Sequence, residues 1–220
     1  MRFRDLGIGF AVAVAAFTLS GCGTPDPLRY AELSSSGQLA PNPHDESGRI
    51  PYRYATQVNW RGYDRIIIAP VEIYRGADHQ FGKMTEEDKH ALADYMKFKF
   101  AEKLQPRFAL TDQPSPSALR LKLTLTGAAA NTAVVSTFTK FDLAGGLYNG
   151  VQAIRGGEGM MGGAVMYVVE LYDSTSGRLL ESYVTKQYPN AMNIGASIGS
   201  LAAAKTGIEK GAEALAAELD

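Results

Sequence analysis

Leucines alternate with polar residues at positions 119–126, which predicts a β-strand with one buried face. The continuous apolar run at 65–73 predicts a central strand, in which Pro70 marks a bulge or a strand end because proline has no N–H group to donate. Two further apolar runs, 165–173 and 179–186, are separated by turn-forming residues and predict a hairpin. Shorter runs predict minor strands at 52–58, where we expect a sheet edge, and at 108–111.

Two segments carry apolar residues at helical spacing. The first follows Thr85, whose hydroxyl suits an N-cap, and its apolar positions recur from Leu92 to Leu104. The second begins at about Ser200, and its small residues predict close packing on a sheet. This order of elements predicts an α+β fold: a two-layer domain with a mainly antiparallel sheet of about five strands and two helices on one face.

The N-terminus has the three regions of a secretory signal. Arg2 and Arg4 precede a short apolar run at 10–17, and small residues follow. A membrane span needs about 20 apolar residues, so this run is too short to be one. The end of the signal resembles the lipobox of bacterial lipoproteins, and it consists of Leu19, Ser20, Gly21 and Cys22.

Cys22 is the only cysteine in the 220 residues. The lipobox resemblance implies that its thiol takes a diacylglyceryl group, that the chain is cut before Cys22, and that the new amino group is acylated. Two or more acyl chains anchor a protein stably in a membrane. By the same resemblance, Gly23 in place of Asp implies the outer membrane, with the protein body facing the periplasm. The alternatives are a buried structural cysteine and a plain secretory signal.

Composition divides the chain into three parts. Residues 1–21 form the lipoprotein signal peptide, and residues 22–50, rich in proline, serine and other polar residues, predict a lipidated Cys and a flexible tether. Residues 51–220 form the α+β periplasmic domain, with a Gly-rich insertion at about 128–163. Without residues 1–21 the chain keeps 20 basic and 22 acidic side chains, a balance that argues against nucleic acid as a partner.

Several blocks together resemble the bacterial lipoprotein family known as domain of unknown function 3313. They are 63–74, the acid-capped helix after Thr85, the strand at 119–126, and 169–180. The resemblance implies an anchored protein of the cell envelope. No activity is established for that family, so it implies no catalytic or binding residues here.

Three patterns suggest chemistry but lack the context that the chemistry needs. Residues 157–162 match G-x-G-x-x-G, yet they precede a predicted strand instead of opening a helix. Ser197 lies in G-x-S-x-G, but the sequence around 188–190 interrupts the strand that should lead into a nucleophile elbow. Metal-ligating side chains without the tight spacing of a zinc site are Asp78, His79, Asp88 and His90, which we expect at the surface. We therefore predict no catalytic residues, no metal and no cofactor.

The Gly-rich insertion combines a loose backbone with large apolar side chains, which favours either a cover on the domain's own core or a partner surface. The candidate partner surface is represented by Phe138, Leu147 and Met160. The sequence thus predicts a non-enzymatic, membrane-anchored envelope lipoprotein that binds an unidentified envelope protein in the periplasm. The alternatives are an auxiliary lipoprotein of an export or lipid-transport assembly, and a serine hydrolase that uses Ser197.

Overall fold

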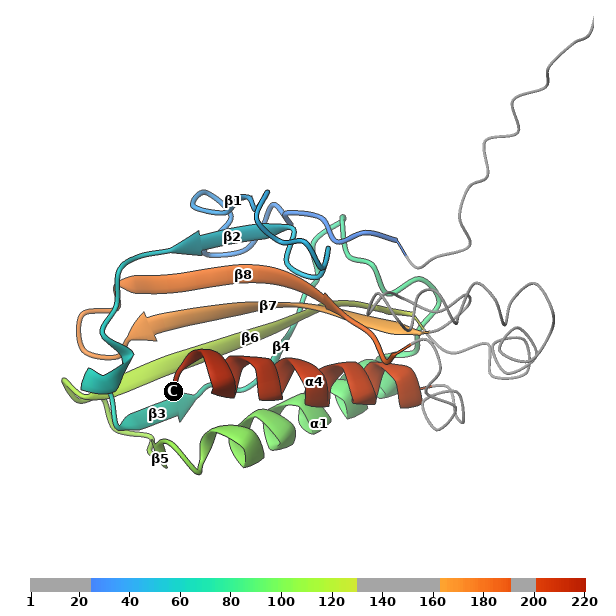
Figure 1. Ribbon diagram of the computed structural model, residues 1–220. Helices are drawn as coiled ribbons and strands as arrows, with labels where there is room; N and C mark the ends of the chain where they lie inside the picture. Colours follow the sequence, from blue (N-terminus) through green and yellow to red (C-terminus); the bar gives the residue numbers. More distant parts are fainter. Residues whose placement is uncertain (1–24, 130–162, 191–200) are drawn as a thin grey trace, which may run out of the picture.

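Three long antiparallel strands form the centre of the sheet (Figure 1). They are β6 (Ala118–Ala129), β7 (Ala164–Asp173) and β8 (Leu179–Gln187). The structure is a computed structural model, and it describes residues 25–129, 163–190 and 201–220. In the turn between β7 and β8, Gly177 has a φ of 66°, a left-handed conformation that glycine adopts without steric cost. The predicted hairpin is therefore present.

The sheet extends on both sides of these strands in the order β1-β2-β8-β7-β6-β3-β5, and β4 also pairs with β6. The pairs on the β8 side are antiparallel, whereas β3, β4 and β5 join the other side in parallel. These strands are β1 (Ala40–Pro41), β2 (Tyr52–Ala55), β3 (Arg65–Ile68), β4 (Glu72–Ile73) and β5 (Ala109–Leu110), and a 3-10 helix, η1 (Trp60–Gly62), follows β2.

The α+β class with two helices is confirmed, but the expectation of about five strands is wrong, since the described sheet has eight. The predicted strand at 65–73 is two strands, β3 and β4, because Pro70 cannot donate to the ladder. In addition, β1 comes from the expected tether and lies outside β2, so β2 is not the edge strand.

Two helices, α1 (Glu86–Leu104) and α4 (Ala202–Glu218), cover one face of the sheet (Figure 1). Thr85 caps α1 as predicted, because its hydroxyl accepts a 3.1 Å hydrogen bond from the Asp88 amide. Small residues let α4 lie close to the sheet: a Cβ added at Gly207 would be 2.7 Å from the carbonyl oxygen of Gln187. A larger residue at that position would push the helix away from β8.

The opposite face is covered by an N-terminal strap, which we define as residues 25–50. Tyr30 and Leu39 of the strap are buried, and they cluster with Val168 of β7 and Val184 of β8. The prediction of a flexible tether at 22–50 is therefore wrong for the described residues 25–50. The strap is polar in composition, but it contains a few apolar side chains. Burying each of them stabilises the folded protein by about 1.5–3 kcal/mol.

The two faces of β6 differ in what covers them. The leucines at 119, 121, 123 and 125 pack under the helices as the alternation predicts. A strand with one buried face would leave the residues of the other face in water, yet Thr124 and Thr126 are buried. The burial of these polar groups places a polar layer inside the protein.

Candidate functional site

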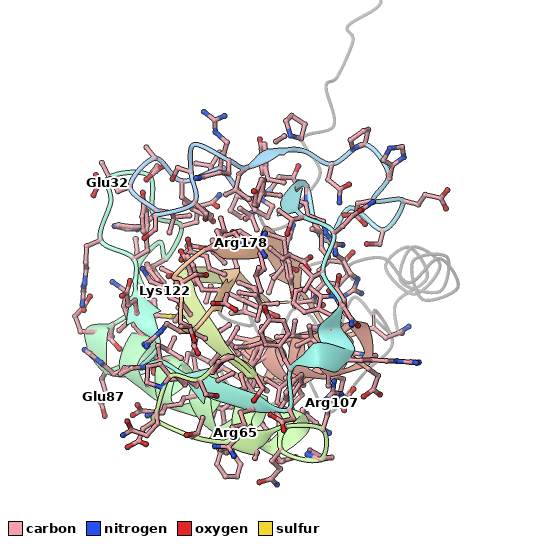
Figure 2. All side chains as sticks on the ribbon, turned by 90° about the vertical axis from the view of Figure 1, so that its left-hand side faces the viewer. Glu32, Arg65, Glu87, Arg107, Lys122 and Arg178 are labelled. Carbon is pink, nitrogen blue, oxygen red and sulfur yellow. The ribbon has the colours of Figure 1, made fainter. Side chains whose placement is uncertain are left out.

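The buried polar layer centres on Lys122 of β6 and Glu170 of β7, which are direct cross-strand partners. The Lys122 ammonium lies 3.2 Å from a carboxylate oxygen of Glu72 and 3.8 Å from one of Glu170. It also donates a 3.4 Å hydrogen bond to the Ser34 hydroxyl of the strap. The layer thus joins the sheet to the strap, and Figure 2 shows Lys122 on the same side of the molecule as Glu32 of the strap.

Glu170 is fully buried, which is costly for a carboxylate without partners. One of its oxygens accepts a 3.1 Å hydrogen bond from the Tyr172 hydroxyl. The other has no hydrogen-bond donor within reach among the described residues, and the same is true of the Thr124 hydroxyl. The Thr124 side chain lines a cavity of about 210 Å³ beside Lys122 and Glu32. Glu170 is therefore held by the Lys122 charge and one tyrosine hydroxyl.

Tyr30 fixes the start of the strap on the sheet. Its ring meets Tyr74 edge to face at 5.3 Å, and its hydroxyl donates a 2.6 Å hydrogen bond to the Gln80 side chain. Burial raises the pKa of the Tyr30 hydroxyl to about 12. The carboxylate of Asp78 accepts from the Tyr74 hydroxyl at 2.6 Å and from the Ala31 amide at 3.1 Å. Burial acts to raise the Asp78 pKa, but these hydrogen bonds outweigh it and the pKa is lowered.

The metal-ligating side chains lie in separate places. Asp78 holds the strap, and the His79 ring lies 5.6 Å from the ring of Phe81. Asp88 is in the first turn of α1, and His90 lies on the exposed side of the same helix. In the ranges 25–129, 163–190 and 201–220, no three His, Cys, Asp or Glu side chains gather in a way that suits a metal ion.

A second cavity, of about 370 Å³, lies where the strap begins. Phe81, Met84, Ala128 and Ala129 make its wall mostly apolar, and Pro25 closes one side. Polar side chains at its edge are Gln80, Lys83 and Asp88. Ala128 and Ala129 are the last residues of β6, and Figure 1 shows that β7 and α4 begin at this same end of the sheet. We call it the cavity end.

A third cluster ties α4 to the sheet. Arg53 of β2 contacts the carboxylates of both Glu181 on β8 and Glu218 on α4, and the Glu181 side chain is 3% exposed. Burial raises the pKa of Glu181 to about 7, the Glu218 carboxylate adds to the rise, and Arg53 opposes it. The Tyr183 ring lies against Arg53 at 5.9 Å. This arrangement makes the cluster sensitive to pH near neutrality.

Several residues singled out in the sequence lie outside the described ranges. They are the lipobox residues Leu19, Ser20, Gly21 and Cys22, the candidate partner surface Phe138, Leu147 and Met160, the glycine motif at 157–162, and Ser197. Their predicted roles stay predictions.

Sequence reasoning missed Glu170, Glu181 and the partners of Tyr30. A signal for the two acids was present, because each interrupts an apolar or uncharged stretch inside a predicted strand. Such a position predicts a buried, paired carboxylate. Tyr30 is one of the few large apolar side chains of the strap and could be expected to dock on the domain, but its partners Tyr74 and Gln80 lie more than 40 residues away in sequence, so the pattern did not identify them.

One mixed sheet with helices on one face and a strap on the other defines a mixed α+β domain. The chain belongs to the family described as protein of unknown function (DUF3313), which it matches over residues 29–215. The resemblance seen in the sequence blocks is therefore confirmed. Among curated proteins, none matches the chain.

Solved structures similar to this chain include a PelC dodecamer and a protein of the family DUF330. The PelC dodecamer from Paraburkholderia phytofirmans has 12% sequence identity and a TM-score of 0.38, over 72% of this chain and 90% of that chain. Protein XCC0632 from Xanthomonas campestris, of the family DUF330, has 10% identity and a TM-score of 0.33, over 81% of this chain and 86% of that one. Of the described helices, none combines the length and the apolar composition that a membrane span requires.

Proposed function

We propose that the protein is an envelope lipoprotein, held on the outer membrane by acylated Cys22, whose periplasmic domain binds another envelope component without catalysing a reaction. The lipobox supports the anchor. The observation that carries the proposal is that the chain already contacts the folded domain at Asp26. The backbone carbonyl of Asp26 accepts a 2.9 Å hydrogen bond from the Gln80 side chain, and the Lys186 ammonium lies 3.7 Å from the Asp26 carboxylate.

The short stretch of chain from Cys22 to Pro25 limits how far the domain can lie from the lipid anchor. Three residues span at most about 11 Å, because an extended chain advances about 3.3–3.6 Å per residue. A tether through residue 50 would instead give a root-mean-square reach of roughly 30 Å. The domain is therefore held near the lipid headgroups with its cavity end toward them. In this position it binds components that lie at or close to the membrane surface.

The apolar cavity favours one alternative, an auxiliary lipoprotein of an export or lipid-transport assembly. An apolar hollow beside a membrane anchor suits the handling of acyl chains, and co-purification with a transporter would support this role. The hydrolase alternative depends on Ser197, and replacing Ser197 with Ala tests it in any assay that detects turnover.

Replacing Cys22 with Ser tests the anchor, because it removes the thiol that accepts the lipid. We expect the unaltered protein to take up radioactive palmitate, to sediment with outer membranes and to enter the detergent phase of Triton X-114. Cys22→Ser loses the label and the detergent partition. Ser20→Ala keeps a small residue in the lipobox and serves as the matched control. Persistent palmitate labelling of Cys22→Ser contradicts the proposal.

Site-specific photo-cross-linking in intact membranes tests the binding role. A photoreactive residue at Lys83, an exposed position at the cavity end, should capture a specific membrane-associated partner. The same residue at Lys97, exposed on α1, is the control, because it lies on the helix layer away from the predicted membrane side. Capture from position 97 alone, or turnover by the pure protein without any captured partner, contradicts the binding role.

A further inference from the structure

The cavity at the start of the strap has the size and the lining of a site for an apolar chain. Its volume of about 370 Å³ lies within the range of roughly 300–1,000 Å³ that small-molecule sites occupy. Buried Phe81 and Ala128 form its floor, and half-buried Met84 and Ala129 extend it. The charged side chains at its edge, Lys83 and Asp88, have opposite signs, so the cavity does not select a charged ligand.

The position of the cavity identifies the occupant. Pro25 is part of the wall, and Cys22 precedes it by three residues, a reach of at most about 11 Å. An acyl chain attached to Cys22 therefore starts within reach of the cavity mouth. A chain bound in this way needs no association from solution, because its effective concentration at the cavity is set by that short connection.

We propose that one acyl chain of lipidated Cys22 inserts into this cavity while the remaining chains stay in the bilayer. The proposal rests on the anchoring function proposed above. Two acyl chains in the membrane suffice for stable anchoring, so binding the third chain does not release the protein. The bound chain fixes the cavity end against the membrane surface and gives the domain one orientation.

A photoreactive fatty acid tests the proposal in the full-length protein. Cells are fed a palmitate analogue that carries a diazirine near the end of its chain, so that Cys22 is acylated with it, and membranes are irradiated. We expect mass spectrometry to find the analogue cross-linked to residues 80–88 or 128–129 of the same molecule. Cross-links only to phospholipid, or only to protein outside the cavity wall, overturn the proposal. Absence of the analogue from Cys22 overturns the anchoring function as well, so the two failures are distinguishable.

Two variants that block the cavity make the test specific. Ala128→Phe fills the floor with a larger side chain, and Met84→Glu places a carboxylate in the wall, so both should lose the cross-link while the analogue stays on Cys22. Ala109→Phe makes the same size change at an exposed position of β5 and should keep the cross-link. Cross-linking that survives both Ala128→Phe and Met84→Glu, with the variant proteins folded by circular dichroism, also overturns the proposal.

Discussion

Replacing Glu181 with Gln should remove a pH dependence of stability that the Arg53 cluster creates. The side chain of Glu181 is almost completely buried, and it shares one guanidinium with Glu218. Contact with Arg53 alone would lower the Glu181 pKa. Burial and the Glu218 carboxylate outweigh this contact and raise the pKa to about 7. A glutamine side chain at this position would keep the shape of the protonated glutamate but could not ionise.

The sign of the effect follows from comparing the two states of the protein. The pKa of Glu181 is about 7 in the folded state, against 4.5 as its ordinary value, so the folded protein binds the proton more tightly. The added stability is fully present below about pH 4.5 and is lost as the pH rises through about 7. Since one pKa unit corresponds to about 1.36 kcal/mol, the loss is at most about 3 kcal/mol. Glu218 shares the proton and the guanidinium, which makes this value an upper limit.

Urea unfolding at pH 5, 6, 7 and 8 measures the effect, with fluorescence of the only tryptophan, Trp60, as the signal. The free energy of unfolding of the natural protein, relative to Glu181→Gln, should fall across this range. Glu218→Gln is the directional control, because removing the neighbouring negative charge should lower the Glu181 pKa and move the fall to lower pH. A difference between the natural protein and Glu181→Gln that stays constant from pH 5 to pH 8 refutes the reasoning.

Three further substitutions test the packing by urea unfolding. Lys122→Met leaves the buried Glu170 carboxylate without its cation and should lower the free energy of unfolding by about 3 kcal/mol. Adding Glu170→Gln should restore part of this loss. If the effects of the two substitutions simply add, the pairing is contradicted. Gly211→Ala places a Cβ against the buried Tyr167 hydroxyl and should lower the free energy of unfolding by about 1–3 kcal/mol. Gly62→Ala is the control, because its Cβ enters open space and should leave stability nearly unchanged. Equal effects of the two substitutions contradict the close approach of α4 to the sheet. Tyr30→Phe removes one hydrogen bond and should lower the free energy of unfolding by about 1 kcal/mol. Tyr30→Ala removes the whole buried ring and should lower it by about 3–5 kcal/mol. If Tyr30→Ala leaves stability unchanged, the docking of the strap is contradicted.

Features that depend on neighbouring residues were predictable from the sequence. The alternation at 119–126 fixes which side of β6 carries leucines, because successive side chains of a strand point to opposite faces. The Thr85 cap and the left-handed Gly177 follow from the bonding and the steric freedom of single residues. These local rules were enough for the α+β class and for the positions of both helices.

The candidate sites were not predictable in the same way. The wall of the apolar cavity combines Pro25, residues 80–88 and residues 128–129, and no local pattern relates segments so far apart. Glu181 is distinguished by Arg53 and Glu218, which approach it from β2 and α4. Its pKa depends on this convergence and on burial, and both are absent in the isolated strand.

The sequence by itself determined the main strands, the helices and the face of each that is apolar, because these depend on periodicity and on capping within a few residues. Only the tertiary structure decided the role of residues 25–50. Their composition is that of a linker, yet Tyr30 and Leu39 are buried against Val168 of β7 and Val184 of β8. The physical reason is that docking depends on the shape and the hydrogen-bond partners of a surface that exists only after the sheet has formed.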